Sequence, residues 1–272
     1  MVEALNLEFM RNALVAALLA SVACGVVGSL VVVNRIVFIS GGIAHSAYGG
    51  IGLAFFLGLS PLLGALGFTV AAALLMGIIS LAQKHRADTF IGVIWALGMA
   101  LGIVLIDLTP GYNVDLMSYL FGSILAVPGG DLFLIAGLDL ILILFALLFY
   151  RPLLALSFDD QFARTRGVPV RSLYLILNVL IALTVVLLIR VAGLILIIAL
   201  LTIPPYIAEA WCRSLKGMMI LAGVLCAAFS LVGLWLSYEL NLTSGPSIIL
   251  VAGGGFFITL AFKGLWRGEA DE

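Results

Sequence analysis

His45 is the residue of this sequence that could most directly take part in chemistry. It lies within a glycine-rich apolar stretch that runs from Ile36 to Gly58. Imidazole is a common ligand of transition-metal ions, and an ionisable side chain inside a membrane-spanning stretch indicates a functional site. Nine residues of helix, at about 1.5 Å each, place it roughly 14 Å deep, near the centre of a bilayer. The alternative is a neutral core histidine bonded to a carbonyl group of a neighbouring helix.

Asp139 is a second ionisable side chain within an apolar segment. It lies eight residues into that segment, about 12 Å deep at the same helical rise, and could face an ion path or make a structural hydrogen bond. Ser46 and Tyr48 follow His45 in its own segment and add polar groups there. Together these residues favour a polar path through the membrane.

The elements that carry these residues are predicted to be membrane-spanning helices. Hydrophobic residues make up 64% of the chain, charged residues 10%, and the mean hydropathy is +1.30, which excludes an ordinary soluble domain. Each crossing of the bilayer core needs roughly 20 apolar residues in a helix. The apolar segments are too long for strands and show no alternation, so an all-α integral membrane protein, a polytopic helical bundle, is favoured over a barrel.

About nine apolar segments can be distinguished, and they form a single transmembrane domain over residues 1–272. The seventh is short enough to be a partial span, so eight spans plus a broken helix are equally compatible. The segments cover residues 12–33, 36–58, 60–82, 89–108, 131–150, 172–189, 192–204, 217–238 and 246–265.

The basic residues predict the orientation of the chain in the membrane. With the amino end outside and the carboxyl end in the cytoplasm, eleven of the 13 lysines and arginines lie inside, and only Arg11 and Arg190 lie outside. This distribution follows the excess of basic residues in cytoplasmic loops.

Two connections are long enough to hold structure of their own. The outer one covers residues 107–130, and its semi-apolar middle between two Pro-Gly pairs predicts a short helix. In the inner one, residues 151–171, Ser157 is expected to begin a one- to two-turn amphipathic helix that ends at Gly167. Asp88 is expected to be the N-cap of the fourth segment.

Pro204 and Pro205 lie at the end of the seventh segment. Proline lacks a backbone donor and clashes with the preceding helical turn, so the pair is expected to interrupt the helix. The residues that follow, as far as Lys216, are amphipathic and predict a short cytoplasmic helix parallel to the membrane. Such a helix suits docking to a soluble partner, and a surface helix without a partner fits the same pattern.

Several function classes find no support in the sequence. It holds no loop of the form Gly-x-x-x-x-Gly-Lys-[Ser/Thr], so any ATP that drives the protein has to be bound by another subunit. A membrane enzyme would need clustered catalytic groups such as His-Glu-x-x-His, and none is present. No nucleic-acid footprint is visible, and the three cysteines lack the spacing of a thiolate metal site.

Six stretches in one order resemble a known family, the permease subunit of bacterial ABC importers for zinc, manganese or iron(II). They span nearly the whole chain. The layout of residues 159–216 is also similar to the vitamin and siderophore importer permeases. The six stretches are Phe38-Ile-Ser-Gly-Gly-Ile-Ala-His-Ser-Ala-Tyr-Gly-Gly50, Asp88-Thr-Phe-Ile-Gly92, Val114-Asp-Leu-Met-Ser-Tyr-Leu-Phe-Gly122, Phe158-Asp-Asp-Gln-Phe-Ala-Arg-Thr-Arg-Gly-Val-Pro-Val170, Ala199-Leu-Leu-Thr-Ile-Pro-Pro205 and Ser244-Gly-Pro-Ser247.

The resemblance implies a type II ABC importer fold and a homodimer around a central path in the bacterial inner (plasma) membrane. A loaded extracytoplasmic metal-binding protein would dock outside, and a separate cytoplasmic ATPase would reset the gate. The chain itself would be no enzyme and would hold no tightly bound cofactor. Its cargo would be a divalent metal ion: Zn²⁺, Mn²⁺ or Fe²⁺.

The resemblance also implies roles for particular residues. His45 matches the family histidine on the ion path and would be a transient metal ligand. With the residues argued from depth and motif, the ion-path candidates are His45, Ser46, Asp115 and Asp139. The candidates for coupling to the ATPase, in the segment after Pro205, are Ala208, Glu209, Arg213 and Ser214.

The chain departs from the family pattern at two positions. Many members carry aspartate four residues before the histidine, on the same helix face, and here that position is Gly41. A histidine found within the fourth helix of some zinc members is Ala96 here. A two-ligand site within one chain is therefore not expected, and two His45 residues from paired chains, with Asp139 or water, are the alternative. Because the expected ligand is an imidazole, zinc is the first choice for the transported metal, with manganese or iron(II) next.

Two other functions remain open at this point. An ion-coupled secondary transporter would also have charged residues at mid-depth, but it would work alone, and the cytoplasmic docking segment argues against it. An ABC permease for a metal chelate fits the similarity to siderophore importers.

Overall fold

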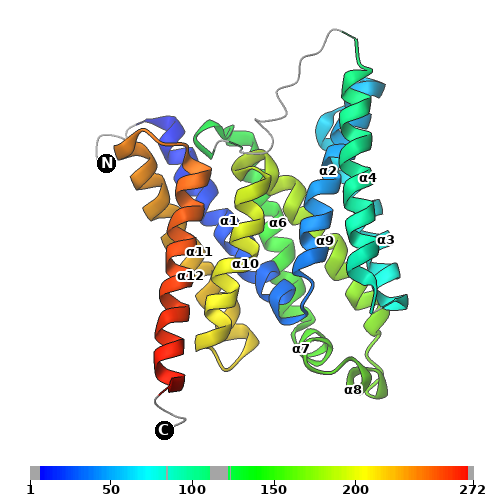
Figure 1. The fold of residues 1–272 in the computed structure, drawn as a ribbon, viewed down its shortest axis with the longest axis vertical. Helices are drawn as coiled ribbons and strands as arrows, with labels where there is room; N and C mark the ends of the chain where they lie inside the picture. Colours follow the sequence, from blue (N-terminus) through cyan, green and yellow to red (C-terminus); the bar gives the residue numbers. More distant parts are fainter. Residues whose placement is uncertain (1–6, 84, 111–121, 123, 269–272) are drawn as a thin grey trace.

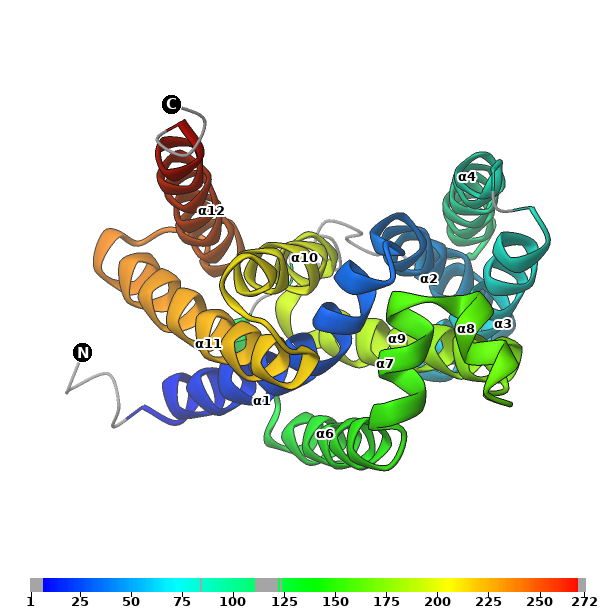
Figure 2. The ribbon, with the colours of Figure 1, turned by 90° about the horizontal axis from the view of Figure 1, so that it is seen from below.

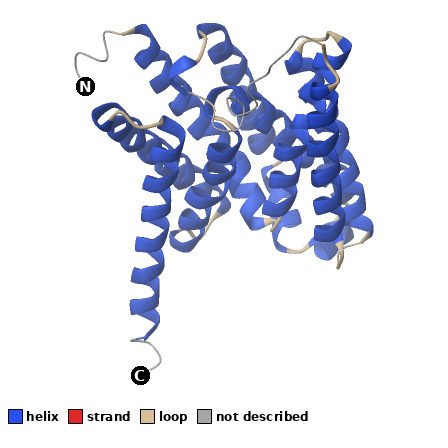
Figure 3. Cartoon of the chain, turned by 45° about the horizontal axis from the view of Figure 1, so that its top comes forward, coloured by secondary structure: helices blue, strands red, loops and turns tan. Residues whose placement is uncertain are grey.

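The chain folds into a bundle of long helices (Figure 1), and within the described ranges all regular structure is helical (Figure 3). The computed structural model describes residues 7–83, 85–110, 122 and 124–268, with side chains as far as residue 262. The predicted all-α fold is confirmed. The helices are α1 (Glu8–Val33), α2 (Val37–Leu57), α3 (Pro61–Ala82), α4 (Ala87–Asp107), the 3-10 helix η2 (Ile124–Ala126), α6 (Gly129–Leu148), α7 (Tyr150–Phe158), α8 (Asp160–Thr165), α9 (Val170–Ala192), α10 (Leu194–Trp211), α11 (Leu215–Leu240) and α12 (Ser244–Gly268).

Nine of the described helices are long and apolar enough to cross a membrane: α1 to α4, α6 and α9 to α12. The nine predicted segments each correspond to one of them. The seventh segment, which the sequence allowed to be a partial span, is the 18-residue helix α10. α1 begins and α12 ends at opposite ends of the bundle (Figure 1), as an odd number of spans requires.

The buried core lies where α1, α2, α9 and α10 meet. α1, α2 and α9 are the most buried of the nine helices, whereas the other faces carry exposed apolar side chains such as Leu97 on α4 and Phe257 on α12. Helices that are apolar on all sides are stable in lipid, because each satisfies its own backbone hydrogen bonds. The outer helices therefore present surfaces suited to lipid or to another membrane subunit.

Glycines bring α2 into close contact with α3 and α4. A Cβ atom at Gly102 of α4 would overlap the carbonyl oxygen of Tyr48, and one at Gly50 of α2 would overlap that of Gly64. Small residues of this kind let transmembrane helices approach backbone to backbone. Gly41 of α2 differs from Gly50, because a Cβ atom there would meet nothing within 4 Å.

Helix α10 continues through Pro204 and Pro205 to Trp211, so the predicted interruption is wrong. Because Pro204 has no N–H, the carbonyl of Leu200 loses its helical donor, and the thiol of Cys226 on α11 donates to it over 3.5 Å. In membrane proteins, neighbouring helices commonly supply hydrogen bonds to the backbone groups that a proline leaves unpaired. The separate cytoplasmic helix expected after the prolines is instead the end of α10, followed by a short turn into α11.

The inner connection contains two short helices, α7 and α8, rather than one. Asp159 is the N-cap of α8, and its carboxylate accepts from the backbone N–H groups of Gln161 and Phe162 at 2.9 Å each. The prediction that Ser157 begins this helix is wrong, because α7 continues past Ser157. The stop at Gly167 is confirmed by its φ of +77°, which favours glycine. The predicted middle helix of the outer connection falls largely within residues 111–121, which lie outside the described residues.

Four helices border one open edge of the molecule. Seen from below, α12 and α4 stand at the two ends of this edge, and α10 and α2 lie between them (Figure 2). α6 lies on the opposite side, where it packs against α1 and α9. The arrangement places the histidine-bearing helix α2 beside the open edge.

Candidate functional site

His45 is positioned by the contact between α2 and α4. It is the ninth residue of α2, and its imidazole ring stacks on the indole of Trp95 from α4, with ring centroids 4.2 Å apart and an interplanar angle of 10°. Its Nδ1 atom is buried and has no hydrogen-bond partner among the described residues. The carbonyl partner expected of a structural core histidine is therefore missing at this atom, which leaves it available to a ligand.

A cavity of about 1030 Å³ ends beside this pair of rings. Helices α2, α4, α10 and α12 contribute to its walls, and Gly41 and Trp95 both line it. Since Gly41 has no side chain and nothing fills the space in front of it, the cavity reaches the backbone of α2 one helical turn from His45. The cavity opens along the same edge of the molecule that α12 and α4 border.

Three charged residues line this cavity. Arg35 lies between α1 and α2, Asp88 lies in the first turn of α4, and Glu209 lies near the end of α10. The expectation that Asp88 caps α4 is wrong, because the helix begins one residue earlier and its N-cap, Arg86, makes no side-chain cap bond. A carboxylate in the first turn is still favoured by the helix dipole.

The other ion-path candidates are distributed over different parts of the fold. Ser46 is fully buried, and its hydroxyl donates to the carbonyl of Ile43 at 2.7 Å within α2. Asp139 is buried on α6, and neither of its carboxylate oxygens has a partner among the described residues. The cavity beside His45 is lined by other residues than Asp139. Asp115 lies outside the described residues.

The coupling candidates are grouped at one end of α10 and in the turn that follows. Ala208 is buried and packs with Met218 of α11, whereas Glu209 and Arg213 are exposed. Ser214 is the N-cap of α11, and its hydroxyl oxygen accepts from the backbone N–H of Gly217 at 3.2 Å. The structure thus brings these residues together in an exposed corner between two long helices.

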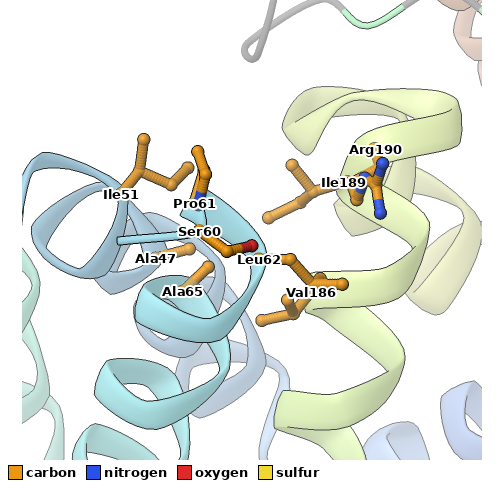
Figure 4. A pocket seen from close by; sticks show the side chains of 9 residues that line it. All are labelled: Ala47, Ile51, Ser60, Pro61, Leu62, Ala65, Val186, Ile189 and Arg190. Carbon is orange, nitrogen blue, oxygen red and sulfur yellow. The ribbon is translucent and has the colours of Figure 1, made fainter. Parts of the chain in front are cut away.

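A second, smaller cavity of about 210 Å³ lies between α2, α3 and α9 (Figure 4). Its lining is mostly apolar, and the charged residue in it is Arg190. The guanidinium of Arg190 pairs with the carboxylate of Asp131 on α6 over 3.2 Å. None of the described ion-path candidates lines this cavity, and the ion pair ties α9 to α6.

Within the described part of the chain, no group of three or more His, Cys, Asp or Glu residues is arranged to hold a metal ion. Trp95 is the residue that sequence reasoning missed. An aromatic residue in an apolar helix gives no functional signal in the sequence. Only the packing of α2 against α4 brings Trp95 into contact with His45.

The bundle and its cavity define a class of protein. Nine candidate spans build the bundle, three charged residues line a large cavity one helical turn from a histidine, and the sequence has no nucleotide-binding loop. These features are those of a transporter permease. Residues 6–263 match the ABC 3 transport family, and the chain belongs to this family. It is the permease subunit of an ABC transporter and not its ATPase, which confirms the resemblance found in the sequence.

Individual relatives agree over nearly the full length. An uncharacterized membrane protein of Synechocystis is 54% identical over 97% of this chain and 94% of its own length. The manganese transport system membrane protein MntC of Halalkalibacterium halodurans is 33% identical over 97% and 93%. The solved structure of PsaBC from Streptococcus pneumoniae, in complex with Fab, matches with a TM-score of 0.84 and 34% identity, over 95% of this chain and 93% of that chain.

Proposed function

We propose that the chain is the membrane permease of an ABC importer that brings a divalent transition-metal ion into the cytoplasm. The observation that carries the proposal is the nearly full-length similarity to a manganese transport permease, at 33% identity. Membership of the ABC 3 transport family agrees with it. The ion would pass His45 and reach the cavity between α2, α4, α10 and α12.

Two copies of the chain would form the path. In one chain the cavity is open along the edge between α4 and α12, and its lining includes the exposed aromatic side chains of Phe38 and Tyr206. A second copy placed on this edge would close the cavity on all sides and cover those apolar surfaces. It would also bring two His45 residues to one path, which compensates for the single imidazole in each chain.

The remaining subunits follow from the same proposal. A cytoplasmic ATPase would bind the corner formed by the end of α10 and the start of α11, and an extracytoplasmic metal-binding protein would deliver the ion. With the amino end outside, Glu209 and Arg213 lie on the cytoplasmic side, where the ATPase would be. The complex would reside in the bacterial inner membrane.

Zinc is our first choice of cargo, with manganese and iron(II) next. A lone imidazole with no carboxylate at position 41 suits zinc, whereas manganese prefers oxygen ligands. The relative MntC is a manganese transport system protein, so manganese is the direct competitor of zinc in the uptake measurement. Few protein ligands suit transit, because an ion that binds weakly can also leave.

The experiment is uptake by vesicles that contain the complex of permease, ATPase and binding protein. Zinc, manganese and iron(II) are each offered with and without ATP. We expect ATP-dependent accumulation of at least one ion, with zinc ahead. Accumulation that is independent of ATP would favour an ion-coupled secondary transporter, and uptake of a chelated metal alone would favour a chelate permease.

His45→Ala tests the residue at the centre of the path. We expect metal uptake to fall at least about tenfold, because loss of a ligand that contributes roughly 1.4 kcal/mol changes an equilibrium tenfold. The assembled complex should keep its elution volume and its ATPase subunit. Uptake at the wild-type rate would remove His45 from the mechanism.

A further inference from the structure

The imidazole of His45 lacks the support that usually orients a metal-binding histidine. Such histidines commonly donate one ring N–H to a carboxylate or carbonyl, which fixes the ring plane. The buried Nδ1 of His45 has no such partner among the described residues. Something else has to fix the ring if its nitrogens are to meet a passing ion in one orientation.

The indole of Trp95 stacks on the imidazole ring of His45. The two planes are nearly parallel, at 10°, and the centroids are 4.2 Å apart. An offset or parallel aromatic contact restricts the neighbouring ring to one plane, while the ring nitrogens stay free at its edge. The α2–α4 contact that holds the two rings together is the glycine-packed one, where the helix backbones touch.

The indole is itself held in place from two other directions. Its Nε1–H donates to the sulfur of Met99, one turn further along α4, at 3.1 Å. The ring of Phe38 from α2 lies against it with centroids 5.9 Å apart and a tilt of 53°. Trp95 therefore has a defined orientation that it can impose on His45.

Trp95 also lines the cavity, whereas His45 is not among the lining residues. Because Trp95 contacts both the imidazole and the cavity, an ion that moves between the two comes close to the indole. The position of this side chain thus affects both the orientation of the ligand and the access to it.

We propose that Trp95 is a positioning residue of the ion path: its indole fixes the plane of the His45 imidazole by stacking and borders the passage from that ring to the cavity. This proposal rests on the proposed function. It assigns to α4 a part of the site that the motif around His45 does not contain.

The test compares three variants of Trp95 in the reconstituted complex. Trp95→Phe keeps a flat ring over His45 and should stay within about twofold of the wild-type uptake at low metal concentration. Trp95→Leu keeps an apolar side chain without a flat ring, and Trp95→Ala removes both. Both should raise the metal concentration for half-maximal uptake by roughly three- to tenfold, which is the range expected for loss of one aromatic contact.

Two further measurements separate positioning from a purely structural role. ATPase association and the thermal midpoint of Trp95→Leu should equal those of Trp95→Phe, since both fill apolar space. Combining Trp95→Leu with His45→Ala should add no further loss, because a residue that acts through His45 has no effect without it. Additive losses, or normal half-saturation in Trp95→Leu, would overturn the proposal.

The proposed function fails in a different way. If the wild-type complex accumulates no metal, or if His45→Ala transports normally, import through His45 is wrong whatever Trp95 does. If His45→Ala is defective while both Trp95→Leu and Trp95→Ala behave like the wild type, import through His45 stands and the positioning role of Trp95 is wrong.

Discussion

At the scale of single residues, the site is defined as much by Gly41 as by His45. The two lie four residues apart on one face of α2, and the space in front of Gly41 belongs to the cavity. A chain with one imidazole and an empty position beside it can contact an ion only briefly. The missing carboxylate is therefore the residue-level feature that should control which metal passes.

Gly41→Asp should convert the single contact into a two-ligand site. A Cβ atom there meets nothing within 4 Å, so the carboxylate can enter the cavity without strain. Because manganese prefers oxygen ligands, we expect the ratio of manganese to zinc uptake to rise by roughly three- to tenfold, a preference of about 1 kcal/mol. Competition between the two ions in the vesicle assay measures the ratio.

The neighbouring glycine provides the control for this substitution. At Gly42 a Cβ atom would lie 2.7 Å from Cγ2 of Ile91, so Gly42→Asp should lower the yield of folded protein. An unchanged metal preference in well-folded Gly41→Asp would show that this position does not set selectivity.

At the scale of elements, glycine contacts decide how α2 lies against its neighbours. The helix carries the histidine, and its backbone touches that of α4 at Gly102. The stack of His45 on Trp95 depends on this approach, because the two rings are on different helices. Helix packing therefore sets the geometry of the site more directly than any local sequence feature.

Two glycines of α4 allow a matched test of this contact. Gly102→Ala would push its Cβ atom into the carbonyl of Tyr48 and should destabilise the protein by roughly 1–3 kcal/mol. Gly92→Ala places a Cβ atom in open space and should be neutral or stabilise by up to about 1 kcal/mol through helix propensity. Thermal unfolding of the two variants in detergent gives the comparison, and equal midpoints would contradict the packing argument.

At the scale of the whole molecule, one open edge and one exposed corner account for the proposed assembly. The edge between α4 and α12 exposes the cavity, and the corner between α10 and α11 exposes charged side chains. In a single chain the edge leaves the cavity open, and the charged side chains of the corner have no partner subunit. They become useful when a second permease covers the edge and an ATPase binds the corner.

Glu209→Lys tests the corner. The side chain is exposed near the end of α10, and reversal of its charge should reduce the amount of ATPase that copurifies with the permease several-fold. Glu239→Lys makes the same change at the far end of α11, about 35 Å along the helix from Lys216, and should leave association unchanged. Equal association in both variants would place the ATPase elsewhere.

The sequence by itself determined the all-α fold class, because long apolar segments can satisfy their backbones in lipid only as helices, and its motifs identified the family. It left nine spans and eight spans plus a broken helix equally compatible, and the structure decided for nine candidate spans. The sequence also singled out His45 as a candidate, since an ionisable side chain in such a segment indicates a functional site. Its errors were local: Pro204 and Pro205 were expected to end a helix, and Ser157 and Asp88 were expected to be caps. In each case a neighbouring residue or helix supplied the hydrogen bonds, or the boundary moved by a few residues.

Tertiary structure alone decided what surrounds the histidine. Three features near His45 depend on how different helices are packed. They are the stack with Trp95, the empty space at Gly41 and the cavity that Glu209 also lines. Hydropathy cannot pair such helices, because lipid is as apolar as the side chains and gives no preference for one neighbour over another. The choice rests on close backbone contact at glycines and on the fit of particular side chains, which appear only when the helices are packed.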